Sequence, residues 1–261
     1  MPCHDIPYDG LTFHCQIDGP EGAPWVVLSN FLLTNLTLWV PQLATVAACR
    51  ILRYDQRGHG RTGVPPTPTT IGQLAGDAAA LMAHFGVQDA TFVGASLGAA
   101  TGLCLAARHE PRIARLLAAG GNPATPPGGS QAWDERIALA RAHGMEALAE
   151  ATLARWFAAP SLASAHPALP AVRAMIERTP LDGFVARARA LQAYDLGPAL
   201  PGIRIPTTLV AGADDSLLPQ TLRAAADRIT GARLHVIGGA GHLPNVEQPA
   251  VFNAILRSIL P

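Results

Sequence analysis

One pentapeptide of this sequence has the residue types and spacing needed for nucleophilic catalysis: Gly94-Ala95-Ser96-Leu97-Gly98 matches the pattern G-x-S-x-G. The apolar residues 90–93 before it predict a buried strand, and the Ala/Leu-rich residues 99–108 after it predict a helix. A serine on a sharp strand-to-helix turn stands above the sheet, and its small neighbours let a substrate approach closely. We therefore interpret Ser96 as a nucleophile rather than as an idle serine in a glycine-rich turn.

A serine hydroxyl is a poor nucleophile near neutral pH, so it needs an adjacent base and a third group that orients this base. His242 is the candidate base, because its loop, residues 238–242, directly follows the last predicted strand, residues 233–237. Five other histidines fit solvated positions or a strand better than this role: His84, His109, His143, His166 and His235.

The orienting acid is expected between the serine and the histidine in the chain. Asp214 and Asp215 both follow the predicted strand 207–211, so either carboxylate could serve. Asp215 leaves 27 residues to His242, enough for one helix and one strand. Asp214 can also be a turn residue that bonds to nearby backbone N–H groups. An acid after the preceding strand is the weaker alternative, because no carboxylate follows that strand until Asp134.

The oxyanion that forms during acyl transfer needs two preorganised N–H donors. The backbone N–H of Leu97, immediately after the nucleophile, is one candidate. The loop that follows the predicted strand 25–29 should supply the other, and we assign it to the N–H of Phe31.

A second charged segment, residues 55–61 (Asp-Gln-Arg-Gly-His-Gly-Arg), lacks the spacing of a metal site, so we interpret it as a loop with ion-pair and turn roles. The sequence has no paired-cysteine or H-E-x-x-H motif, no acidic Ca²⁺ loop, and no G-x-G-x-x-G after a strand. We therefore expect a mechanism without a metal or a cofactor.

The elements that must position these residues alternate between strand and helix, which predicts an α/β fold with a mostly parallel sheet flanked by helices. The alternation breaks at a Pro/Gly-rich stretch after the predicted strand 113–118, and helical patterns follow it. We expect residues 123–206 to form an inserted helical cap, and residues 1–122 and 207–261 to form the core domain. Such a cap would place a pocket over the carboxyl ends of the strands. The predicted strands are 11–17, 25–29, 50–54, 90–93, 113–118, 207–211 and 233–237; the predicted helices are 71–85, 99–108, 132–142, 145–156, 168–177, 181–192, 220–229 and 246–260.

The composition excludes several classes of function. The formal net charge is zero, so nothing indicates a nucleic acid or an anionic membrane as partner. The chain has no lysine, which excludes Schiff-base chemistry on a lysine. Four scattered cysteines and an N-terminus unlike a signal peptide lead us to expect reduced thiols and a cytoplasmic protein. The expected partner is a small-molecule substrate, and a homo-oligomer stays open.

The residues together resemble the α/β-hydrolase superfamily nearly from end to end, and more narrowly the 3-oxoadipate enol-lactone hydrolases of aromatic-compound breakdown. The resemblance implies a Ser96, Asp215 and His242 triad, and its Gly-x-x-Asp-x-x-x-Pro pattern, Gly212 to Pro219, favours Asp215 over Asp214. The segments that carry the resemblance are 27–30 (Val-Leu-Ser-Asn), 53–60 (Arg-Tyr-Asp-Gln-Arg-Gly-His-Gly), the serine motif, 153–157 (Leu-Ala-Arg-Trp-Phe) and 241–249 (Gly-His-Leu-Pro-Asn-Val-Glu-Gln-Pro).

The chain departs from these lactonases beside the predicted oxyanion hole, where Phe31 replaces a small residue and Leu33 replaces a glycine. We expect Leu33 and the cap residue Trp156 to line a bulky, apolar pocket that favours neutral substrates. Most arginines of the cap are expected on solvated helix faces. Because Arg155 adjoins Trp156, we expect one of these two to line the site and the other to face solvent.

The leading interpretation is a serine hydrolase that cleaves a small carboxylic ester or lactone through an acyl-enzyme, similar to a 3-oxoadipate enol-lactonase. Alternatives on the same fold are a carboxylesterase or other lactonase with a more apolar pocket, and a carbon–carbon bond hydrolase. A different class of function is a small-molecule receptor that keeps the pocket without turnover.

Overall fold

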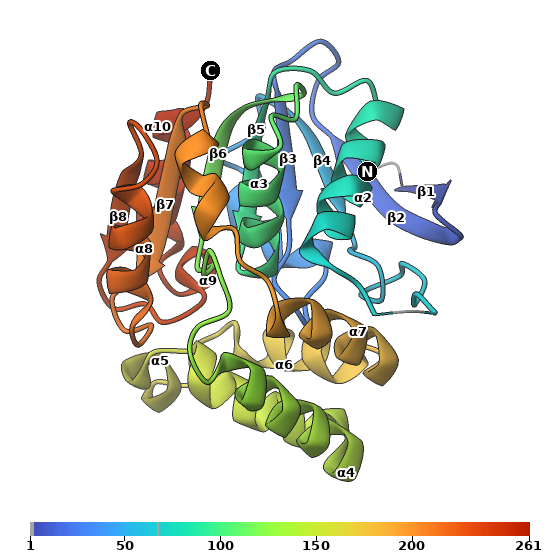
Figure 1. Cartoon of the computed structure of the whole chain (residues 1–261), viewed down its shortest axis with the longest axis vertical. Coiled ribbons are helices and arrows are strands. Elements are labelled where there is room, and N and C mark those ends of the chain that lie inside the picture. Colours follow the sequence, from blue (N-terminus) through green and yellow to red (C-terminus); the bar gives the residue numbers. More distant parts are fainter. Residues whose placement is uncertain (1–2, 67) are drawn as a thin grey trace.

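The computed structural model describes residues 3–66 and 68–261 and contains an eight-stranded sheet (Figure 1). The strands lie in the order β1-β2-β4-β3-β5-β6-β7-β8. β1 pairs antiparallel with β2, β2 pairs antiparallel with β4, and all later neighbours pair in parallel. The strands are β1 (Cys3–Tyr8), β2 (Leu11–Asp18), β3 (Trp25–Ser29), β4 (Arg50–Tyr54), β5 (Ala90–Ala95), β6 (Ile113–Ala119), β7 (Thr207–Gly212) and β8 (Arg233–Ile237).

The mostly parallel α/β sheet predicted from the sequence is confirmed, and one strand was missed. β1 lies at the sheet's edge, and only Ile6 of its six residues is buried. The parallel strands β5 and β7 are buried along their whole length, because helices cover both faces of a parallel sheet. Such strands are continuous apolar runs in the sequence, which explains why they were predicted from it.

Two of the helices that cover the sheet, α2 and α3, lie side by side in front of it in Figure 1. α2 begins with a capping box between Thr70 and Gln73, which satisfies the first free N–H groups of the helix. The sheet-covering elements are η1 (Leu36–Trp39), α1 (Val40–Leu43), α2 (Ile71–His84), α3 (Leu97–Ala107), α8 (Leu218–Ala226), α9 (Pro244–Glu247) and α10 (Pro249–Ile259).

Four consecutive helices form a separate layer at the bottom of Figure 1, beyond the carboxyl ends of the strands. They lie within residues 123–206, the predicted cap. The first is longer than predicted, because the two expected helices join at a kink where Gly144 has φ 80°. The chain returns to the core through a short helix, η2 (Gly197–Gly202). The four helices of this layer are α4 (Gly129–Trp156), α5 (Ala159–Ala163), α6 (Leu169–Arg178) and α7 (Leu181–Gln192). The sequence did not predict α5. No helix in residues 3–66 and 68–261 is long and apolar enough to cross a membrane.

The charged loop after β4 has the ion-pair and turn roles that the sequence indicated. The buried Asp55 carboxylate accepts hydrogen bonds from the backbone N–H groups of Leu36, at 2.8 Å, and Arg61, at 2.9 Å. The Arg57 guanidinium donates to the Asp77 carboxylate, with Nε to Oδ2 at 2.6 Å. Arg187, from α7, donates to the Arg57 carbonyl and so ties the helical layer to this loop.

His59, in the same loop, makes the stability of the protein sensitive to acid. Burial, with the nearby Arg187 charge, lowers the pKa of the fully buried His59 to about 3, from an ordinary value near 6.5. Between these two values the unfolded chain binds a proton that the folded protein does not. The free energy of unfolding should therefore fall as pH falls from about 6.5 towards 3, by up to about 1.4 kcal/mol per pH unit from this group.

Urea unfolding of the wild-type protein and of His59→Gln at pH 7, 6, 5 and 4 tests this prediction. The variant is expected to lose stability less steeply with acid than the wild type, whatever its stability at pH 7. Equal slopes for the two proteins would show that His59 does not contribute.

Candidate active site

The turn between β5 and α3 has the geometry that its glycines require. Ser96 has φ 52° and ψ −105°, in the left-handed region that non-glycine residues seldom adopt. A Cβ atom on Gly94 would lie 2.1 Å from the Gly98 carbonyl oxygen, and a Cβ on Gly98 would lie 2.1 Å from the Ser29 carbonyl oxygen. Only glycine fits at these two positions, so the pentapeptide itself dictates a tight turn with Ser96 at its apex.

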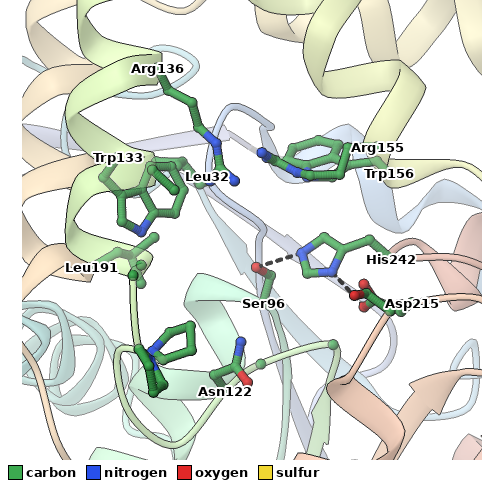
Figure 2. A pocket seen from close by; sticks show the side chains of 18 of the residues that line it. Leu32, Ser96, Asn122, Trp133, Arg136, Arg155, Trp156, Leu191, Asp215 and His242 are labelled. Carbon is green, nitrogen blue, oxygen red and sulfur yellow. Dashed lines mark hydrogen bonds and ion pairs between the residues drawn. The ribbon is translucent and has the colours of Figure 1, made fainter.

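Three side chains from separate loops meet at this turn (Figure 2). The Nε2 atom of His242 lies 3.0 Å from the Ser96 hydroxyl, and its Nδ1 atom lies 2.7 Å from Oδ2 of Asp215. His242 comes from the loop after β8, and Asp215 comes from the loop after β7. The neighbouring Asp214 is exposed, and no side-chain hydrogen bond to it is present in the described part of the chain. Of the two aspartates left open by spacing, Asp215 is therefore the one in contact with the histidine.

The imidazole of His242 packs against two aromatic rings, which also contact each other. The ring of Phe31 meets it edge-on with centroids 5.5 Å apart, and the indole of Trp156 lies 5.8 Å away. The backbone N–H of His242 also donates to the Trp156 carbonyl oxygen at 2.7 Å. Phe31, which the sequence analysis assigned only a backbone role, thus also packs against the histidine ring.

The two backbone segments assigned to the oxyanion hole lie side by side. Leu97 is the first residue of α3, a position whose N–H has no acceptor within its own helix. The N–H of Gly98 donates to the Asn30 carbonyl oxygen at 3.0 Å, which fixes the loop that carries Phe31 against the start of α3. This arrangement leaves the N–H of Leu97 beside Ser96 and places Phe31 next to it.

A cavity of about 480 Å³ opens above Ser96 and His242 and is closed on its far side by α4. Trp156 lines it, as predicted. Leu33 does not: Leu32 lines the cavity, whereas Leu33, at a positive φ of 63°, is buried in the hydrophobic core. The prediction for Leu33 was wrong because the turn after β3 changes which of the two leucine side chains points into the cavity. Lining residues that sequence reasoning did not single out are Asn122, Trp133, Arg136, Leu191 and Tyr194.

Two guanidinium groups face this cavity from opposite halves of the kinked α4, and Figure 2 shows both above Ser96. Arg136 lies over the Trp133 ring, 4.4 Å from its centroid, a pairing that their i, i+3 spacing could have indicated. Burial and the charge of Arg155 lower the pKa of Arg136 to about 10. Partial desolvation at the cavity wall lowers the pKa of Arg155, although the residue keeps solvent contact, and the nearby Asp215 charge offsets only part of this shift.

Neither guanidinium forms an ion pair with a carboxylate within residues 3–66 and 68–261. Other arginines of the helical layer do: Arg173 pairs with Glu150 at 2.6 Å, and Arg189 with Asp134 at 2.7 Å. Both Arg155 and Trp156 line the cavity, so the expectation that only one of them does was wrong. Trp156 is buried, whereas Arg155 is also exposed to solvent, as expected for one of the pair. Two unpaired positive charges on the cavity wall make it electrostatically suited to an anion.

Comparison with known proteins identifies the class. The model of the alpha/beta hydrolase family matches residues 22–255, so the chain belongs to this family.

Particular relatives are also similar along their whole length. A 3-oxoadipate enol-lactonase of Acinetobacter baylyi is 32% identical over 100% of this chain and 95% of its own length. A Caulobacter protein with the provisional name carbamate hydrolase RutD is 32% identical over 97% of this chain and 96% of its own. The crystal structure of the enol-lactonase from Burkholderia xenovorans superposes with a TM-score of 0.92 at 37% identity, over 98% of each chain. The protein is therefore a member of a hydrolase family whose similar relatives include enol-lactonases.

Proposed function

We propose that this protein is a serine hydrolase that cleaves a small carboxylic ester or lactone through an acyl-enzyme intermediate. The observation that supports it is the continuous contact from Ser96 through His242 to Asp215 on the floor of a cavity. No cofactor takes part in the proposed reaction, and residues 123–206 act as the cap over the site. The similarity to enol-lactonases is consistent with a lactone as substrate.

In the proposed mechanism, the Ser96 hydroxyl attacks the substrate carbonyl while Nε2 of His242 accepts its proton. The Asp215 carboxylate holds the imidazole through Nδ1 and stabilises the imidazolium that forms. The N–H groups of Leu97 and Phe31 stabilise the oxyanion. The imidazolium then protonates the leaving oxygen, which in a lactone stays attached to the acyl group. Water, activated by the same histidine, releases the acid and restores Ser96.

The charge of the cavity indicates the class of substrate. Among the residues that the structure describes, no carboxylate forms an ion pair with Arg136 or Arg155, so a substrate that carries its own carboxylate would gain charge-assisted hydrogen bonds that a neutral ester would not. From the apolar residues after β3 alone we expected a preference for neutral substrates. The two guanidinium groups reverse that expectation, and we propose an anionic lactone or ester.

Replacing either arginine with glutamine is expected to lower kcat/KM for an anionic enol-lactone by about 10- to 100-fold, as expected for one lost hydrogen bond to a charged group. The effect should fall mainly on KM, and hydrolysis of a neutral aryl ester should change little. Arg173→Gln is the matched control, because it removes a cap guanidinium that pairs on the surface. Equal losses on the anionic and the neutral substrate would contradict the proposed anion site.

A non-catalytic receptor on the same fold predicts a different outcome. It would bind the anionic lactone, with weaker binding in the arginine variants, but an aryl ester would release no more than one equivalent of its leaving group. Sustained turnover of either substrate excludes the receptor.

A further inference from the structure

The carboxylate of Glu247 is buried beside the proposed site but contacts no reacting atom. Its side chain belongs to the short helix α9, and the residue is only 5% exposed. Oε1 accepts a hydrogen bond from the backbone N–H of Ala158 at 2.8 Å, and Oε2 accepts one from the N–H of Gly241 at 2.7 Å. In the described part of the chain Glu247 forms no ion pair, so both oxygens serve backbone donors.

These two donors belong to the segments that matter most for the proposed reaction. Gly241 directly precedes His242, and Ala158 follows the end of α4, which carries Arg155 and Trp156. The two segments are already in contact, since a Cβ atom on Gly241 would lie 2.6 Å from the Trp156 carbonyl oxygen. The carboxylate therefore bridges the exit of the cap helix and the loop of the histidine.

The helix that carries Glu247 is itself anchored to the core. The Gln42 amide donates to the Asn245 carbonyl oxygen at 2.8 Å, and Asn245 is fully buried. A carboxylate on an anchored helix can hold two separate backbone segments in register.

We propose that Glu247 is a positioning residue that couples the cap to the catalytic histidine. This inference rests on the proposed function. By holding Ala158 and Gly241 together, Glu247 keeps His242 aligned with Ser96. The same contacts keep Arg155 and Trp156 in place on the cavity wall. It acts through these residues and does not touch the substrate.

Glu247→Gln tests the inference with nearly the same side-chain volume. An amide has only one acceptor oxygen, so its NH₂ group must face one of the two N–H donors. The bridge should open at one end, and His242 should lose its alignment. We expect the rate constant for labelling of Ser96 by a neutral aryl phosphonate to fall about 10- to 100-fold, as expected for displacement of a reacting group by about 1 Å. Because Arg155 shifts too, KM for an anionic lactone should rise while kcat falls.

Asp55→Asn is the matched control, because Asp55 is a second buried carboxylate that accepts two backbone N–H bonds, outside the site. It should lower the melting temperature, as Glu247→Gln does, but leave the labelling rate of the folded protein unchanged. Ala158→Pro opens the bridge from the other end and leaves Glu247 in place. The angles of Ala158, φ −60° and ψ 147°, suit proline, which has no N–H to donate. It should slow labelling as Glu247→Gln does.

Folded Glu247→Gln and Ala158→Pro proteins that label at the wild-type rate, or an equal slowing in Asp55→Asn, would overturn the positioning role. A wild-type protein that is not labelled at Ser96 would instead overturn the proposed function, so the two failures are distinguishable. If Glu247→Gln does not fold, Ala158→Pro alone decides between these outcomes.

Discussion

Replacing Ser96 with alanine is expected to lower kcat for ester or lactone hydrolysis by about 10⁴-fold or more, with the fold intact. The reason is that Ser96 provides the only hydroxyl in contact with Nε2 of His242 within the described residues. Removing a triad nucleophile leaves only the catalysis that the oxyanion hole and substrate binding provide. The measurement is steady-state hydrolysis of an aryl ester and of an enol-lactone by purified variant and wild type.

The fold should survive this change, because alanine tolerates the apex of the turn no worse than serine and the glycines that permit the turn remain. Circular dichroism and thermal melting check this point. Ser258→Ala is the control, since Ser258 is an exposed serine on α10. A well-folded Ser96→Ala protein that keeps near-wild-type turnover would disprove the role of Ser96.

Replacing Asp215 with asparagine is expected to lower kcat by about 10⁴-fold, as the corresponding change does in serine proteases. Asparagine cannot stabilise the imidazolium, and its NH₂ group favours the wrong tautomer of His242. The contact between Asp215 and Nδ1 of His242, at 2.7 Å, is the basis of this prediction.

Asp214→Asn is the matched control for the acid, because it makes the same chemical change one residue away on an exposed side chain. Its kcat should stay within a few-fold of the wild type, and both variants should melt near the wild-type temperature. A larger loss of kcat in Asp214→Asn than in Asp215→Asn would show that the acid is assigned to the wrong residue.

The sequence was sufficient for the fold because its central strands are continuous apolar runs between clear turn signals. β3, β4 and β8 have the predicted bounds, and the other predicted strands differ by one or two residues. The edge strand β1 was missed, because an edge strand with one buried residue has no continuous apolar signal. The kink at Gly144 was also not visible, since two helices joined end to end have the same pattern as two separate ones.

The residues of the candidate site likewise fall into those that the sequence predicts and those that it does not. Ser96 and His242 stood out because a glycine-rich turn and a loop at a strand end are local sequence signals. The two arginines that face the cavity did not, because Arg136 and Arg155 are 19 residues apart and converge only through the kink in α4. The error at Leu33 came from a positive φ that nothing in its residue type indicates. The bridge by Glu247 also depends on contacts between segments 89 residues apart.

The covalent intermediate is the most direct test of the proposed mechanism. Wild-type protein mixed rapidly with an excess of an aryl ester should release about one equivalent of phenol in a burst before steady turnover. Mass spectrometry of the quenched protein should show one added acyl group, located on the peptide that contains Ser96. Steady turnover without a burst, together with no acyl adduct in either wild type or the slow Asp215→Asn variant, or an adduct on any other residue, would contradict it.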